Sequence, residues 1–236
     1  MYAKPAPSLG QYDLHHLIIF LMLTGAFVAT AGLVLTVDYE YQRIGLKVFS
    51  LRANQLGDYR LSEMAYVING STLSYGMCTL LGMFGLYQLR LDRLSKLMAL
   101  TGAWMGLSIL LMGIYPLNYL TEHRFWSTNM LLSCLLICLV TIVGWLSHKC
   151  YCTRGMTVVS ILLFLVSFSI LLQVDLRTLR LLPCDQLMEP HFCATAMNSW
   201  AMSILSVIWD VLLALNMRKL VIKDYQTRSL RHLKGE

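Results

Sequence analysis

Long runs of apolar residues, separated by short polar stretches, dominate the chain. Six runs have about the 20 residues that cross roughly 30 Å of hydrocarbon as an α-helix. None alternates apolar and polar residues with the period of two that a membrane β-strand shows. A helix also satisfies its own backbone hydrogen bonds, which lipid cannot do. The predicted spans are Leu14–Val37, Tyr66–Leu89, Leu97–Pro116, Trp126–Ser147, Met156–Val174 and Ala194–Met217.

The composition agrees with this pattern. Of the 236 residues, 57% are hydrophobic and 14% are charged, whereas a soluble domain carries about 25% charged residues. The first apolar run is longer than the roughly 7–15 residues of a signal-peptide core, and no cleavage site of small residues follows it, so we expect it to remain as an anchor. The sequence therefore predicts an all-α, polytopic membrane protein with a single bundle of six transmembrane helices.

The distribution of basic residues predicts the orientation of this bundle. Lysine and arginine total 12 on the side that holds both termini and the second and fourth loops, against 7 on the other side. The richer side includes a basic tail at residues 218–236 and is expected to be cytoplasmic. The net charge of +6 fits anionic lipid headgroups, whereas nucleic-acid binding would explain none of the apolar runs. A bacterial inner membrane and a eukaryotic endomembrane both fit.

Several polar residues fall in the predicted exterior loops. Pro116 has no backbone N–H and disfavours helix at Tyr115, so it should end or kink the third span near the exterior surface. That would bring His123, seven residues further on, beside the first exterior loop. An enzyme acting on lipid at this surface would use His123 as its acid–base residue. The catalytic candidates are His123, Glu122, Asp58 and His191.

Asp210 is the only acidic residue well inside a predicted span. Because a carboxylate is costly in hydrocarbon, it should face the bundle interior or a wet cavity. One interpretation is a proton or cation relay, which would make the protein a small proton-coupled transporter. The other is a carboxylate near the cytoplasmic end of its helix that is protonated or paired with a basic side chain.

Two pairs of residues point to structural roles. Cys184 and Cys193 share the last exterior loop, where an oxidising environment would allow a disulfide. Gly102 and Gly106 form a GxxxG pair in the third span, and small residues let two helices approach closely in lipid. Packing within the bundle is the expected use of this pair, and dimerisation is the alternative.

No cofactor or metal is predicted. The sequence has no HxxxH or HExxH pair of zinc ligands, no GxSxG nucleophile motif and no phosphate-binding glycine loop. A haem held by two histidines inside the bundle would need histidines well inside the spans. All six histidines instead lie in loops, at span ends or in the tail.

Two stretches, residues 53–89 and 100–132, carry a family resemblance. Their shared features are a Leu-Gly pair before the second span, an asparagine entering it, a G-x-[FY]-P sequence and a histidine at the fourth span. The chain thereby resembles the uncharacterised bacterial six-helix membrane family DUF-nine-nine-eight, which is distantly similar to the eukaryotic Frag/DRAM/Sfk membrane proteins. The resemblance implies a six-helix bundle with a polar cluster at its outer face, and it assigns no particular activity to the chain. The matching positions are Leu56, Gly57, Asn69, Gly113–Pro116, His123 and Ser127.

The leading functional hypothesis is non-catalytic: a lipid-binding protein, or an accessory subunit that docks on another membrane protein. It is favoured because no complete set of catalytic residues is visible in the sequence and because the spans contain almost no charged residues. Membrane lipid and a membrane-protein partner are the expected partners. The alternatives are a lipid-modifying enzyme around His123 and a proton-coupled transporter centred on Asp210.

Overall fold

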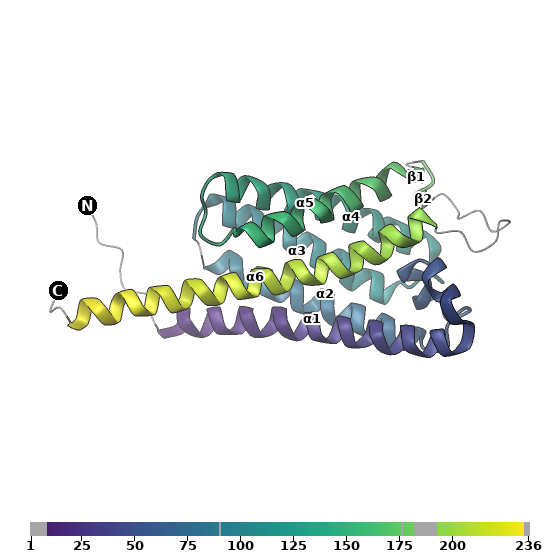
Figure 1. Cartoon of the computed structure of the whole chain (residues 1–236), viewed down its shortest axis with the longest axis horizontal. Coiled ribbons are helices and arrows are strands. Elements are labelled where there is room, and N and C mark those ends of the chain that lie inside the picture. The colour runs from purple at the N-terminus through teal and green to yellow at the C-terminus, as the bar shows by residue number, and fades with distance from the viewer. Residues whose placement is uncertain (1–8, 90, 176, 182–192, 234–236) are drawn as a thin grey trace.

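The computed structural model describes residues 9–89, 91–175, 177–181 and 193–233 of the chain. Within them, six long helices run side by side along one axis (Figure 1). Two 3₁₀ segments follow the first helix, and a pair of two-residue antiparallel strands follows the fifth. The elements are α1 (Leu9–Ile44), η1 (Gly45–Ser50), η2 (Ala53–Gly57), α2 (Ala65–Gln88), α3 (Arg93–Ile114), α4 (Leu120–Leu146), α5 (Arg154–Leu172), β1 (Val174–Asp175), β2 (Arg180–Leu181) and α6 (Ala194–Leu233).

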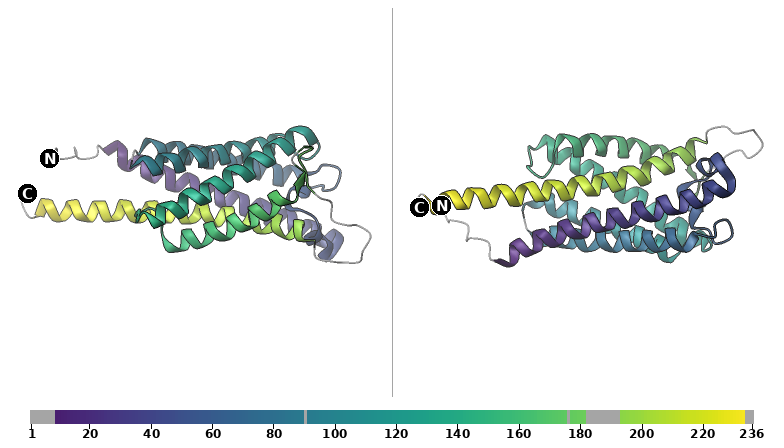
Figure 2. Two further views of the ribbon diagram at one scale, coloured as in Figure 1. Left: turned by 90° about the horizontal axis from the view of Figure 1, so that it is seen from above. Right: turned by 60° about the horizontal axis from the view of Figure 1, so that its bottom comes forward.

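The helices form a closed ring. Each packs against its neighbours in sequence, and α6 closes the ring by packing against α1 as well as α5. The start of α1 and the end of α6 lie at one end of the bundle, the terminal end, where α6 projects beyond the other helices (Figures 1 and 2). The other end, which carries η1, η2 and the strand pair, is the capped end.

Five helices, α1, α3, α4, α5 and α6, are long and apolar enough to cross a membrane. The outer surface of the ring carries large apolar side chains that are mostly exposed, including Phe20, Phe27 and Leu172. Such a surface fits lipid rather than water, so this is a multi-pass membrane protein. Helix α2 is less apolar because serine, threonine, asparagine and glycine make up much of its length.

Helix boundaries differ from the predicted spans at several points. The prediction that Pro116 ends the third span is confirmed, since α3 stops at Ile114. A tight turn follows, in which Tyr119 N donates to Pro116 O at 2.8 Å, so α4 begins at Leu120 and His123 lies in its first turn rather than in a loop. Helix α6 continues to Leu233 because no glycine or proline interrupts it.

A polar network ties the loops together at the terminal end. Asp92 caps α3: its Oδ1 accepts from Ser95 N at 2.7 Å and from the Tyr151 hydroxyl at 2.8 Å. Its Oδ2 lies 2.7 Å from Lys149 Nζ. Burial alone would raise the pKa of Asp92, but the hydrogen bonds from Lys149, Ser95 and Tyr151 outweigh it and lower that pKa to about 2. Asn216 on α6 joins the network by donating to Tyr151 O at 3.2 Å.

We expect Asp92→Asn to lower the free energy of unfolding by about 1 kcal/mol at neutral pH, a modest loss because the ion pair is partly exposed and asparagine still caps the helix. A carboxyl group whose pKa is lowered by folding stabilises the protein above its unfolded pKa of about 3.9. That contribution disappears as the pH falls toward the folded value of about 2. The melting temperatures of the two proteins in detergent should therefore converge over this range.

Glu122→Gln is the matched control because Glu122 is exposed and makes no such network. It should leave the melting temperature unchanged at neutral pH. A difference between Asp92→Asn and the unsubstituted protein that stayed constant down to the lowest pH would contradict a role for the carboxylate charge.

Candidate functional site

A cap closes one end of the ring interior, formed by η1 and η2 and held by α6. The Trp200 indole packs with the fully buried Val48, and its Nε1 donates to Leu51 O at 2.8 Å. The backbone N–H of Ala53 donates to Ser199 Oγ at 3.2 Å. These bonds join a loop near the start of the chain to a helix near its end, and they place η2 over the interior.

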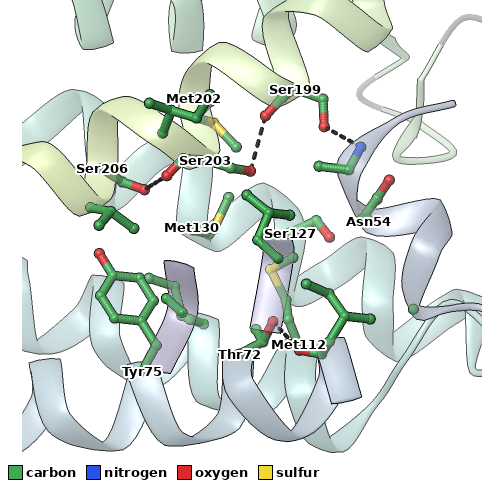
Figure 3. Close-up of a pocket in the computed structure, with 18 of the residues that line it drawn as sticks. Asn54, Thr72, Tyr75, Met112, Ser127, Met130, Ser199, Met202, Ser203 and Ser206 are labelled. Carbon is green, nitrogen blue, oxygen red and sulfur yellow. Dashed lines mark hydrogen bonds between the residues drawn. The ribbon is translucent and has the colours of Figure 1, made fainter. Parts of the chain in front are cut away.

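Below the cap lies a cavity of about 390 Å³ (Figure 3). Sites for small molecules generally measure about 300–1,000 Å³ and are mostly apolar. The cavity is partly open to the outside. Its lining residues Thr30 on α1 and Ile204 and Ile208 on α6 are exposed at the ring surface, which places the opening between α1 and α6. Its apolar walls include Leu33, Ile68, Ile109, Met112, Met130 and Met202.

His123 lies at the capped end of this cavity and is only 4% exposed. Its Nδ1 is 2.9 Å from Tyr115 O, and its Nε2 is 3.2 Å from Asn54 Nδ2. A carbonyl oxygen only accepts, so Nδ1 carries the proton. In the neutral ring Nε2 then accepts from the Asn54 amide. Both nitrogens are thus occupied: Nε2 joins α4 to the cap, and Nδ1 joins α4 to the end of α3.

Two polar atoms near His123 lack partners among the described residues. The buried Asn54 Oδ1 and Ser127 Oγ make no hydrogen bond, and both side chains line the cavity. They lie together at one end of it, opposite Tyr75 and Ser206 (Figure 3). A buried polar atom left unpaired costs about 1–3 kcal/mol, so this end is suited to a ligand with a polar group.

The remaining catalytic candidates do not join His123. Asp58 Oδ1 accepts from Asn118 Nδ2 and from Arg60 N, both at 2.9 Å, which holds the α3–α4 turn against the cap. Glu122 is exposed, and His191 lies outside the described residues. The structure thus shows no carboxylate hydrogen-bonded to His123, and the predicted catalytic set is not assembled among the described residues.

Two arginines place positive charge close to His123 at the capped end. The charges of Arg52 and Arg124 act on His123 and on each other, and neither forms an ion pair with any described residue. Burial lowers the pKa of the Arg52 guanidinium, and the charge of Arg124 lowers it further. An anion bound here would favour the charged form of Arg52 and so oppose both the burial and the repulsion from Arg124.

A second polar cluster lies deeper, where α2 faces α6 across the ring interior. Asp210 is fully buried, and its Oδ2 accepts from the Thr79 hydroxyl at 3.0 Å. Its Oδ1 and the Tyr75 hydroxyl have no hydrogen-bond partner among the described residues, although the two groups interact electrostatically. Tyr75 and Ser206 also line the cavity, so this cluster borders its deep end.

No basic side chain is paired with Asp210 among the described residues, so of the two forms in the second interpretation the structure does not show the paired one. Toward the terminal end the interior fills with buried apolar side chains, including Met83, Leu213 and Met217. Asn216 is also buried there, but it donates to Tyr151 O and Thr153 Oγ1 in the α4–α5 loop and to Met156 Sδ on α5. The polar cluster therefore borders the cavity on one side and an apolar core on the other.

The predicted cysteine pair is only partly described. Cys193 is disulfide-bonded, and Cys184 lies outside the described residues, so the pairing stays a prediction. Cys78, Cys134, Cys138, Cys150 and Cys152 are free thiols. Across the described part of the chain, no three His, Cys, Asp or Glu side chains come close enough together to hold a metal ion.

Sequence reasoning found Asp210 but missed Tyr75 and Thr79, the groups on α2 that it meets. Tyr75 and Thr79 are four residues apart on α2, as are Ser206 and Asp210 on α6, and residues at that spacing share a helix face. That spacing was a usable signal on each helix. Nothing in the sequence indicated that the two faces meet, because α2 and α6 are not neighbours in the chain.

No family model, no curated protein and no solved structure matches this chain. The resemblance to the bacterial six-helix family therefore stays a prediction.

Proposed function

We propose that this multi-pass membrane protein binds a membrane lipid, with the acyl chain in the cavity and the head group at the capped end. The observation that carries the proposal is the cavity itself, which is apolar along its walls and open at the ring surface between α1 and α6. In a bilayer that opening would face hydrocarbon, so a lipid tail would enter from the membrane without crossing water.

The polar groups at the capped end favour an anionic head group. Arg52 and Arg124 are without ion-pair partners among the described residues, and Asn54 Oδ1 and Ser127 Oγ are unpaired. A phosphate would accept from the arginines, and a head-group hydroxyl would donate to Asn54. These four residues give the proposal its specificity for a phospholipid over a neutral lipid.

We further propose that α2 crosses the membrane with the other five helices, with both termini cytoplasmic. Its 24 residues extend about 36 Å at 1.5 Å per residue. Its small and polar residues largely face α1 and α3, and Tyr66 and Phe84 are exposed on its outer side. The basic-residue count supports the orientation.

The enzyme and transporter hypotheses have less support. Both ring nitrogens of His123 are occupied, so it is not poised to transfer a proton to a substrate. A transporter requires a polar path from Asp210 to each surface, and the interior next to it is apolar on the terminal side.

We expect Ser203→Phe to reduce the amount of lipid that co-purifies with the protein in mild detergent by about tenfold. A bulky ring in the cavity wall would occupy the space of an acyl chain, and tenfold corresponds to about 1.4 kcal/mol of lost binding. Lipid would be quantified by mass spectrometry against protein. Leu215→Phe is the control because Leu215 lies on the same helix, is 39% exposed and does not line the cavity.

The head-group assignment is read in the same experiment. A double variant, Arg52→Gln with Arg124→Gln, should lose phospholipid selectively and keep neutral lipid. Equal phospholipid retention by Ser203→Phe, Leu215→Phe and the unsubstituted protein would mean that lipid coats the ring surface only, and the proposal would fail.

A further inference from the structure

The polar cluster between α2 and α6 lacks the compensation that a buried charge needs. Asp210 is 0% exposed and Tyr75 is 5% exposed, and each has an oxygen atom without a hydrogen-bond partner among the described residues. Among the described residues, the carboxylate accepts from the Thr79 hydroxyl and also interacts with the Tyr75 hydroxyl, and neither group carries a positive charge. A buried carboxylate is usually matched by a cation, because removing it from water is costly.

The polar atoms of this cluster that could coordinate a cation are all oxygens. Tyr75 and Thr79 present hydroxyls from α2, and Ser206 and Asp210 present a hydroxyl and a carboxylate from α6. The Tyr75 hydroxyl interacts with both Ser206 and Asp210, so the four groups converge. The titratable groups that interact electrostatically with Asp210 among the described residues are Tyr75 on α2 and Cys134 on α4, and neither is basic. One acidic residue fits a single positive charge.

We propose that this cluster binds a monovalent cationic group, either a sodium ion or the ammonium group of a lipophilic amine, which reaches Asp210 through the cavity. Because Tyr75 and Ser206 line the cavity, a cation at its deep end would contact their oxygens and the unpaired Asp210 Oδ1. Figure 3 shows the Tyr75 hydroxyl turned toward Ser206 on α6. This site lies at the opposite end from the proposed head-group site, and it does not require lipid to bind there.

The test uses the full-length protein in detergent at pH 8, with thermal unfolding followed by tryptophan fluorescence. Sodium chloride is titrated against N-methylglucamine chloride at constant ionic strength. In a second series decylamine, which is protonated at this pH, is compared with decanol. We expect one of the two cations to raise the melting temperature by about 3–5 °C at saturation, and decanol to have no such effect. Which cation acts identifies the source of the positive charge.

Two variants keep the carboxylate and test the site directly. Thr79→Val and Tyr75→Phe preserve side-chain shape and remove one oxygen each, so each should weaken the cation response about tenfold. Ser74→Ala is the control because its hydroxyl bonds to Gly70 O at an exposed position of α2. Asp210→Asn should abolish the response and, without cation, melt at or above the temperature of the unsubstituted protein, because an uncompensated charge is gone.

A melting temperature that neither cation changes would overturn the proposal and mean that Asp210 is simply protonated. So would a response that persists in both Thr79→Val and Tyr75→Phe. Lipid retention measured on the same samples separates the two proposals. An absent cation response with normal phospholipid content would overturn the cation site and support lipid binding. A normal cation response without bound phospholipid would support the cation site and overturn lipid binding.

Discussion

Gly76→Ala is expected to lower the free energy of unfolding by about 3 kcal/mol, at the upper end of what overpacking usually costs. A methyl group at Gly76 would lie 2.8 Å from Gly106 O and 2.6 Å from Leu110 Cα. Both atoms belong to the backbone of α3, so no side-chain rotation relieves the clash and the helices must move apart. Alanine's better helix propensity, worth about 1 kcal/mol, offsets only part of the loss.

Gly102→Ala is the matched control on the facing helix. A methyl group there would meet the side chain of Met83, which is flexible and readily adopts another rotamer, so the cost should be about 1 kcal/mol or less. Unfolding in detergent, followed by tryptophan fluorescence, would measure both. Equal stability of the two variants would contradict the backbone-to-backbone packing of α2 on α3. Because Gly102 and Gly106 face α2, this packing also leaves the GxxxG pair no room for a second copy of the chain.

The second large effect is expected at Trp200. Trp200→Ala should lower the free energy of unfolding by about 3 kcal/mol, because truncating a buried tryptophan removes packing and leaves a void. It also removes the hydrogen bond to Leu51 O and the edge-to-face contact with Phe49, whose ring centre lies 6.1 Å away. The cap should then detach from α6, and backbone amides of η2 should exchange hydrogen faster.

The cap carries Asn54, so the same variant should also retain less lipid. Trp145→Ala provides the comparison: Trp145 is 39% exposed on α4, and its loss should change neither stability nor lipid content appreciably. Retention of normal lipid by a folded Trp200→Ala protein with fast-exchanging η2 amides would show that the cap does not contribute to the binding site.

The apolar runs determined the class of this protein without help from the tertiary structure. A run long enough to cross a bilayer has to be helical there, because only a helix satisfies its backbone within the run. The effect of Pro116 on α3 could also be predicted from the local sequence, because proline lacks the backbone N–H that a continuing helix needs. Boundaries were less accurate where polar residues extend a helix past the apolar stretch, as at His123 on α4 and beyond Met217 on α6.

The candidate sites depended on contacts that no local pattern encodes. The sequence singled out His123 as a candidate acid–base residue near the exterior surface and Asp210 as a carboxylate inside a span, but their partners lie far away in the chain. Asn54 is 69 residues from His123, and Thr79 is 131 residues from Asp210. The expected carboxylate partners of His123 proved to be occupied or exposed instead.

What the sequence determined by itself was therefore that this is a helical membrane protein, because hydrophobicity and backbone hydrogen bonding act locally along the chain. Only the tertiary structure decided which helix faces meet. That outcome follows from packing: small residues such as Gly76 allow the backbones of α2 and α3 to touch, whereas α2 and α6 meet through the side chains of Thr79 and Asp210, at the deep end of a cavity. Because lipid is as apolar as the helix faces themselves, hydrophobicity does not decide which faces pack together; side-chain shape and a few polar contacts do.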